Sequence, residues 1–407
     1  MRAPPPANRA RKTAHPSRKA GSLTLAPFAS HGGRRRATLQ LPAPLTSLIG
    51  REREAEVVLA LLPNREVRLV TLTGPGGVGK TRLALHVAGS VRTHYADGVA
   101  FVPLAPICHA EFVAPTIARA LGIRVTGGQL LIDDLQTALH DQHLLLVLDN
   151  FEHVATAAPL IVDLLAGCPR LTVLVTSRES LRLSGEHDIR VPPLALPPVD
   201  RGSSVAELTD VAAVHLFVER AKAVRRDFAL TGANASAVVE ICRRLDGLPL
   251  AIELAAARIA ILPPEALLAR LEQRLPLLIG GPRDAPDRLR TVHNAIAWSH
   301  VLLSEQEQMI FRRLTVFVGG VTLDAAEAVA GGSLASSDTP PRCDPSDAIT
   351  ALDGTNLDAA SVFDIVSSLV DKSLLLSGEH DGQPRLTMLE IIREFGLERL
   401  HRSGEEH

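Results

Sequence analysis

Aromatic residues are scarce in this sequence, which leaves Leu, Val, Ile and Ala to build the core. Phe, Trp and Tyr make up only 3% of the 407 residues. Hydrophobic residues still account for 46% and charged residues for 22%, which is typical of a globular protein. At ~150 residues a domain, a chain of this length is expected to contain two or three domains.

Several other features are missing, and each excludes a class of protein. The four cysteines Cys108, Cys168, Cys242 and Cys343 form no C-x-x-C pair, which argues against a zinc site or disulfide framework and fits a reducing cytoplasm. No apolar run approaches the ~20 residues of a membrane span, so no membrane partner is expected. The net charge of −2 creates no overall field that would attract nucleic acid.

Acidic residues are absent from the first 45 positions, which are rich in Arg, Pro, Ala and Ser. Such a segment buries too little apolar surface to order itself, so we expect a disordered basic tail over residues 1–45. No apolar core of the signal-peptide type follows the basic start. Arg34–Arg36 could contact nucleic acid or an acidic membrane, but a solvated tail or an overextended start site is the favoured interpretation.

The strongest motif is the segment Gly74–Thr81, which has the form G-x-x-x-x-G-K-[ST]. An apolar run over residues 67–72 precedes it and a helical pattern over 83–88 follows, as a P-loop requires. The alternative, a Gly-rich turn with a chance lysine, does not account for these flanks. Backbone N–H groups of such a loop cradle phosphates, because its glycines leave the space open: Gly74, Gly76, Gly77 and Gly79.

Side chains around this loop are assigned nucleotide contacts accordingly. Lys80 is expected to reach the β- and γ-phosphates, and the Thr81 hydroxyl to ligate Mg²⁺. The neighbouring Val78 and Arg82 are expected to line the same ligand. The sequence therefore predicts a site for a nucleoside triphosphate or diphosphate.

Two later apolar runs each end in a charged residue, one suited to bind Mg²⁺ and the other to bind a phosphate. Leu144–Asp149 has the Walker B pattern, in which Asp149 would hold Mg²⁺ opposite Thr81. Residues 171–178 form a further strand pattern that ends at Arg178. Parallel strands present their carboxyl ends at one edge, so Arg178 is expected near the γ-phosphate. Asp149 and Arg178 are the candidate catalytic residues, although chance acids and surface arginines also follow strands.

The pattern changes after the first 191 residues, and this change sets the expected domain limits. Prolines over 192–198 mark a linker, and helical patterns follow without a strand signal. A second break at 280–286 precedes three helices with short strands, which is a winged-helix pattern. The prediction is an α/β P-loop NTPase domain with a parallel sheet, an all-α helical domain and a winged-helix domain: 46–191, 192–285 and 286–402, the last with an inserted loop at 331–360.

These motifs, in this order, resemble the NB-ARC group of STAND signal-transduction NTPases, specifically bacterial regulators often joined to LuxR-type DNA-binding modules. The resemblance covers roughly residues 45–400. It rests on the P-loop and on six further segments: LIGRERE at 48–54, LVLDNFEH at 146–153, TSR at 176–178, GLPLAIELAAAR at 247–258, LVDKSLL at 369–375 and MLEIIREFGLERL at 388–400. It implies a core, a helical domain and a winged helix that close over bound ADP.

The resemblance also assigns roles to single residues and shows two departures. It implies that Pro249 packs on the adenine or ribose and that Arg51 lies close to the base. Many ATP-hydrolysing relatives carry a second acid directly after the Walker B Asp, but Asn150 stands here and Glu152 comes two residues later. Slow or partner-dependent hydrolysis is therefore expected. In eukaryotic relatives a winged-helix His contacts the ADP phosphate, and Leu389 at the matching position cannot make that contact.

Three functions fit these observations. The favoured one is an ATP/ADP-binding switch in bacterial transcription or signalling, working through a protein partner or output module and through nucleotide-dependent self-association. A conventional P-loop ATPase or kinase is the second, but the chain lacks an evident acceptor site. A winged-helix DNA-binding regulator is the third. The candidate recognition helix carries Asp358, Asp364 and Asp371 with only Lys372, so direct DNA binding by this chain is not expected.

Overall fold

A computed structural model describes most of the chain after its first 40 residues. The described residues all lie in the compact unit Thr38–His407. They comprise 41–43, 45–123, 131–198, 204–271, 291–330, 359–380 and 383–404. The break expected at 280–286 lies outside them, as do the basic tail except for 41–43 and 45, and the inserted loop except for 359–360.

A five-stranded parallel sheet lies at the centre of the first part of the chain, with the strand order β2-β3-β4-β1-β5. Its strands are β1 Leu69–Thr73, β2 Gly98–Pro103, β3 Leu144–Asp149, β4 Leu171–Thr176 and β5 Glu186–Arg190. Every residue of β1, β3 and β4 is buried, as near-continuous Leu and Val runs predict for strands covered on both faces. Strand β5 was not predicted from the sequence, because this edge strand is polar and only partly buried.

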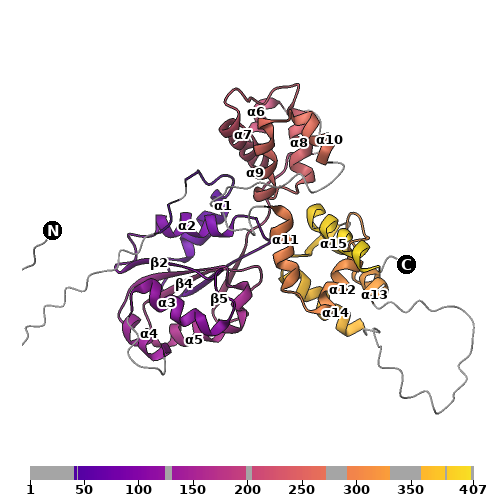
Figure 1. Cartoon of the computed structure of the whole chain (residues 1–407). Helices are drawn as coiled ribbons and strands as arrows, with labels where there is room; N and C mark the ends of the chain where they lie inside the picture. The colour runs from indigo at the N-terminus through magenta and orange to yellow at the C-terminus, as the bar shows by residue number, and fades with distance from the viewer. Residues whose placement is uncertain are drawn as a thin grey trace, which may run out of the picture. The chain divides into compact units, whose positions relative to one another are not determined.

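Helices cover both faces of this sheet (Figure 1). Helices α1 and α2 pack on one face and α3, α4 and α5 on the other. Alternate residues of β3 supply the two cores, with Leu145 in one and Leu146 in the other. The helices are α1 Glu52–Leu61, α2 Lys80–Ser90, α3 Val113–Leu121, α4 Leu131–Leu139 and α5 Ala158–Gly167, with the 3₁₀ segments η1 Ala110–Phe112 and η2 Phe151–Ala157.

The next part is helical throughout its described residues, 204–271, as the absence of strand patterns predicts. Its helices are α6 Val205–Asp210, α7 Ala212–Val224, α8 Ala235–Arg244, α9 Pro249–Ala257 and α10 Pro264–Leu271, with η3 Arg258–Ala260. Helix α6 was not predicted from the sequence; it is a six-residue helix that begins with a Ser204–Glu207 capping box. Leu194 in the proline-rich segment donates its N–H to the Gly247 carbonyl, at 2.9 Å. The segment before α6 is thereby tied to the turn before α9.

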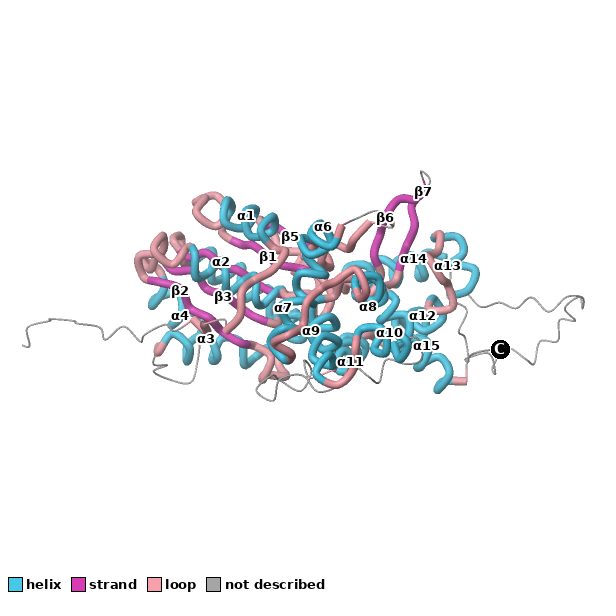
Figure 2. Tube along the Cα trace, turned by 90° about the horizontal axis from the view of Figure 1, so that it is seen from above, coloured by secondary structure: helices cyan, strands magenta, loops and turns pink. Residues whose placement is uncertain are grey.

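The last part combines helices with one antiparallel hairpin. Its elements are α11 Val292–Val301, α12 Glu305–Leu314, α13 Leu323–Ala330, α14 Ala359–Asp371, β6 Leu376–His380, β7 Gln383–Thr387 and α15 Glu390–Ser403. The β6–β7 hairpin is seen in Figure 2. Helix α15 packs closely on the end of α12, because a Cβ at Gly396 would lie 2.2 Å from the Thr315 side chain. Among the described helices, none has the length and apolar character of a membrane span.

Candidate functional site

The P-loop joins the end of β1 to the start of α2, as the sequence predicts. Gly74, Gly77 and Gly79 have φ angles of 142°, 81° and 100°, which residues with a Cβ rarely adopt. A Cβ at Gly74 would lie 2.6 Å from the Val191 carbonyl oxygen, and one at Gly77 only 2.9 Å from the Leu250 Cβ. The glycines therefore allow both the loop's curvature and the close approach of later segments.

Lys80 begins α2 and its side chain turns back onto the loop. Its Nζ donates to the carbonyl oxygens of Gly74 at 2.7 Å and Pro75 at 3.1 Å. Burial lowers the pKa of Lys80 to about 8, and the negative charge of Glu152 opposes this shift. The loop thus holds a buried cation, in the place where a phosphate-binding loop needs one.

Thr81 and Asp149 are brought together, as the Walker B pattern predicts. The Thr81 hydroxyl donates to Asp149 Oδ1 at 2.6 Å, and the Thr176 hydroxyl donates to the same oxygen at 2.7 Å. Thr176 also accepts the backbone N–H of Asn150 at 3.0 Å, a positioning role that the sequence did not reveal. Hydroxyl and carboxylate oxygens are the hard ligands that Mg²⁺ prefers, so these residues fit it. A bound Mg²⁺ would neutralise phosphate charge here.

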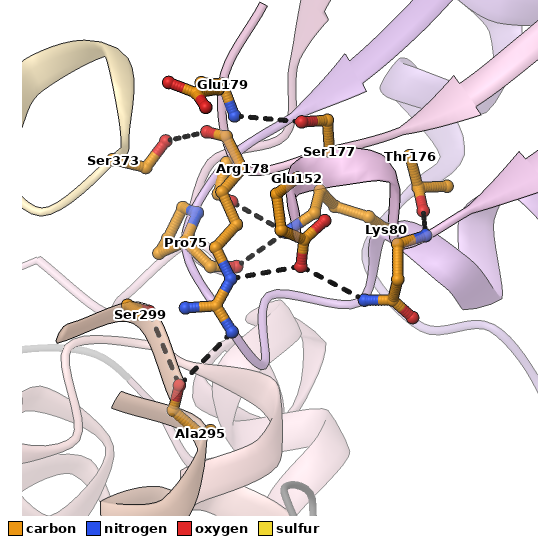
Figure 3. A network of polar contacts seen from close by, with 12 residues as sticks. Pro75, Lys80, Glu152, Thr176, Ser177, Arg178, Glu179, Ala295, Ser299 and Ser373 are labelled. Atoms are coloured by element: carbon orange, nitrogen blue, oxygen red, sulfur yellow. Dashed lines mark hydrogen bonds and ion pairs between the residues drawn. The ribbon is translucent and has the colours of Figure 1, made fainter. Parts of the chain in front are cut away.

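Glu152 and Arg178 form a buried ion pair beside Lys80 (Figure 3). Asn150, with φ 64°, turns the chain after β3 and places Glu152 in η2. Arg178 Nε and Asn150 Nδ2 each donate to Glu152 Oε1 at 3.2 Å. Burial acts to raise the pKa of Glu152, but the charges of Arg178 and Lys80 together with hydrogen bonds to the carboxylate lower it overall. The carboxylate is therefore ionised at neutral pH.

Arg178 also contacts the last part of the chain, which sequence reasoning did not anticipate. Its Nη2 donates to the Ala295 carbonyl of α11 at 3.3 Å, and the Ser373 hydroxyl donates to the Arg178 carbonyl at 2.9 Å. Ser373 has a φ of 57° and lies in the turn after α14, two residues beyond Asp371. The arginine expected near the γ-phosphate is thus joined to two later elements (Figure 3).

Arg51 and the GLPL segment, residues 247–250, both contact the P-loop. The Arg51 guanidinium is buried and donates to the Val78 carbonyl at 3.0 Å. Pro249 is the first residue of α9, and the following Leu250 donates its N–H to the Gly77 carbonyl at 3.2 Å. These contacts place Arg51 and Pro249 next to the loop, at positions where the edges of a nucleotide could touch them.

Arg82 and Val78 have evident structural partners. The Arg82 guanidinium donates to Glu253 of α9 at 3.1 Å and to the Ser47 carbonyl at 2.7 Å. The Val78 side chain is fully buried in the core that includes α1 and α2. Arg82 therefore joins α2 to α9 and to the segment before α1. Val78 contributes its backbone to the loop.

A cavity of about 260 Å³ adjoins the Glu152–Arg178 pair. Its lining combines residues of η2 with residues from the last part of the chain: Glu152, His153, Thr156, Arg178, Ser299 and Lys372 among them. Polar groups of both charges thus surround a space large enough for several water molecules.

Leu389 is buried in the hydrophobic core, which leaves it unsuited to contact a phosphate. A polar contact lies beside it. Asp246, directly before the GLPL segment, accepts the Ile391 N–H at the start of α15 at 3.2 Å. Burial raises the pKa of Asp246 to about 7, with further contributions from the charges of Glu390 and Glu394. This contact between the α8–α9 turn and α15 had no signal in the sequence.

Comparison with known proteins agrees with this geometry. A family model described as an AAA domain matches residues 64–186. That range contains the P-loop, Asp149, Glu152 and Arg178. The chain therefore contains an AAA-type P-loop NTPase domain.

Three relatives extend the similarity beyond this domain. Rv0890c of Mycobacterium tuberculosis, named as an HTH-type transcriptional regulator, is 44% identical over 339 residues, covering 83% of this chain and 34% of that protein. Rv0894 of the same organism, named as an uncharacterized protein, is 38% identical over 362 residues, covering 89% and 83%. The regulatory protein AfsR of Streptomyces griseus is 30% identical over 233 residues, covering 54% and 22%. The chain thus spans about a third of Rv0890c.

Proposed function

This chain belongs to the same protein family as Rv0894 of Mycobacterium tuberculosis, and on that premise we propose that it is an ATP/ADP-dependent regulatory switch of the NB-ARC type. One observation carries the proposal. Segments far apart in the sequence converge on the P-loop and on Arg178, namely the start of α9 through Leu250 and α11 through Ala295. A ligand in the loop would therefore act on contacts that hold later parts of the chain.

Arg178 is the residue through which the two nucleotides would be distinguished. ADP and ATP differ by one phosphate, and a guanidinium is a planar, permanently charged partner for its oxygens. A ligand shifts a conformational equilibrium only through its different affinity for the two conformations. An arginine that binds either the γ-phosphate or the Ala295 carbonyl supplies such a difference.

The same proposal assigns a role to each of the three parts of the chain. Residues 46–191 bind the nucleotide, residues 192–285 form the helical domain, and residues 286–402 form a winged-helix domain that closes the site. Helices α11–α15 with the β6–β7 hairpin support the last assignment. The relatives named as regulators support an output in transcription, reached through a partner protein or an attached LuxR-type module.

Direct DNA binding is less well supported by α14. The segment Ala359–Lys372 contains Asp364 and Asp371, and its one basic residue is Lys372. Lys372 is paired with Glu307, its Nζ lying 2.5 Å from Oε1. DNA affinity depends on cations that can reach phosphates, so we assign α14 to packing within the closed form.

Limited proteolysis of the full chain tests the switch. The proline-rich segment at 192–198 is partly exposed, and its cleavage reports whether Leu194 stays packed against the α8–α9 turn. We expect different cleavage patterns with ADP, with a non-hydrolysable ATP analogue and without nucleotide. Arg178→Ala should bind ADP within a few-fold of the wild type yet give one pattern for both nucleotides. The exposed Arg226→Ala is the matched control and should behave as the wild type.

Identification of the nucleotide that co-purifies with the chain complements this test. The proposal predicts a bound adenine nucleotide. Identical cleavage of the wild type in all three conditions would overturn the switch and leave a static nucleotide-binding protein. Transfer of the γ-phosphate to an acceptor molecule would instead favour a kinase.

A further inference from the structure

Neither nucleotide binding nor the distinction between ADP and ATP explains why the Glu152 carboxylate is buried. Its side chain is 3% exposed, and Arg178 and Asn150 each donate a hydrogen bond to Oε1. Oε2 is buried and has no hydrogen-bond partner within the described part of the chain. A buried carboxylate oxygen without a donor is unfavourable, so this group is a candidate for a role toward a ligand.

Glu152 is near both components of a hydrolysis reaction. Its charge interacts with that of Lys80, the residue that marks the position of the β- and γ-phosphates. It also lines the cavity of about 260 Å³, which offers room for water beside the Arg178 guanidinium. A carboxylate that reaches both the phosphate end of the loop and a polar cavity is suitably located to orient a water molecule.

We propose that Glu152 is the carboxylate that orients and deprotonates the attacking water during ATP hydrolysis, and that its ion pair with Arg178 keeps it out of use until a γ-phosphate draws the guanidinium away. In this reaction the water oxygen bonds to the γ-phosphorus, and the bond to the β–γ bridging oxygen breaks with its electron pair going to ADP. The water proton passes to Glu152 and then to the released phosphate. This inference rests on the proposed nucleotide switch.

Glu152 does not stand at the usual position for the second acid, which is directly after Asp149. Asn150 stands where many relatives carry the second acid, but its left-handed backbone turns the chain so that Glu152 comes back to the site. Asn150 then holds Oε1 through its side-chain amide. When Arg178 moves to a phosphate, Glu152 loses a cationic partner and becomes a better proton acceptor. One arginine would thereby couple recognition of the γ-phosphate to activation of the base.

Single-turnover hydrolysis by the full chain tests this assignment. Glu152→Gln keeps the shape and removes the proton acceptor, so the rate at saturating ATP should fall at least ~100-fold, the usual minimum for a general base. ADP affinity measured by calorimetry should stay within about three-fold, because ADP lacks the γ-phosphate that competes with Glu152 for Arg178. Glu56→Gln is the matched control, since this exposed residue of α1 lies outside the cavity and should leave the rate unchanged.

A second variant covers the case in which Glu152→Gln does not fold. Glu152→Asp keeps the charge and withdraws it by one methylene, so it should bind nucleotide normally and hydrolyse ATP at least ~10-fold more slowly. A wild-type rate in either variant, or no hydrolysis by the wild type, overturns the role of Glu152. In those cases nucleotide-dependent proteolysis would still uphold the switch, whereas a wild type that binds no nucleotide removes both proposals.

Discussion

The site has two halves that differ in how they are built. The loop half consists of the P-loop, Lys80, Thr81 and Asp149, which follow directly from strand ends and a helix start. The closing half consists of Arg51, Leu250, Ala295 and Ser373, which reach the loop or Arg178 from other parts of the chain. The motifs of the loop half can be recognised in the local sequence, whereas the contacts of the closing half become evident only in the packed chain.

This difference is informative about function. Binding a phosphate requires only the loop half, which generic P-loop proteins share. Distinguishing ADP from ATP requires that something outside the loop responds to the phosphate. The closing half supplies such contacts, through Leu250, Ala295 and Ser373 of the later parts of the chain. The buried Arg178–Glu152 pair lies between the two halves: Arg178 contacts Ala295 and Ser373, and the charge of Glu152 interacts with that of Lys80. Since a buried ion pair is weak evidence for stability, we interpret this pair as part of the conformational switch.

The largest expected effect is a change of folding stability with pH, which arises from Asp246 and its contact with α15. The raised pKa of about 7 means that the folded chain holds a proton that the unfolded chain loses near pH 4. Stability should therefore fall by about 2–4 kcal/mol as pH rises from about 4 to about 7, and stay lower above that range. Asp246→Asn keeps the acceptor for Ile391 and tolerates the positive φ of 50°. It should remove this fall.

Urea unfolding of both proteins between pH 4.5 and 8 measures the effect. We expect the curves to converge at low pH and to separate at pH 8, where the Asn variant is the more stable. Parallel stability profiles would show that Asp246 does not titrate in this range. ADP affinity at pH 8 should be nearly equal in the two proteins, since the loop half is untouched.

Loss of the loop lysine should weaken nucleotide binding next most strongly. A charge-assisted hydrogen bond contributes ~1.5–3 kcal/mol, so Lys80→Ala should reduce ADP affinity roughly 10- to 100-fold. Calorimetry measures this, with the exposed Lys222→Ala as control. Unchanged affinity in Lys80→Ala would remove the assignment of the P-loop. Because burial lowers the pKa of Lys80 to about 8, wild-type affinity should also decline as pH rises above 8.

Gly77→Ala tests the contact between the two halves. Gly77 and Gly185 have similar φ angles of 81° and 78°, but a Cβ at Gly77 would meet Leu250 while one at Gly185 meets nothing within 4 Å. Backbone strain should cost each variant about 1–2 kcal/mol. Only Gly77→Ala should also increase cleavage at 192–198, because it displaces α9. Equal cleavage in the two variants would show that Leu250 yields without moving the helix.

The smallest effect is expected for Arg82. Its ion pair with Glu253 is about one-third exposed on both sides, so a double-mutant cycle of Arg82→Gln and Glu253→Gln should give a coupling of ~0.2–1 kcal/mol in thermal unfolding. ADP affinity should change less than about two-fold in Arg82→Gln. A ten-fold loss would instead support direct contact with the nucleotide, as the sequence suggested.

The two halves also differ in how far the sequence alone predicted them. Leu144–Asp149 was predicted with the bounds of the actual strand, and the pairing of Thr81 with Asp149 followed from their positions at one sheet edge. Strand β5 was missed because Glu186–Arg190 lacks an apolar pattern. The contacts of Ala295 and Ser373 could not be foreseen, since a backbone carbonyl and a single serine leave no signal until the chain is packed. Glu152 was noticed only as a nearby acid.

Hydrogen–deuterium exchange of the full chain with ADP and with a non-hydrolysable ATP analogue tests the central claim most directly. If the γ-phosphate takes the Arg178 guanidinium from the Ala295 carbonyl, the analogue should accelerate exchange in α11. Exchange in β1 and β3 should stay slow with both nucleotides, because these buried strands belong to the binding core. Exchange in α11 that is the same with ADP, with the analogue and without nucleotide would contradict the switch.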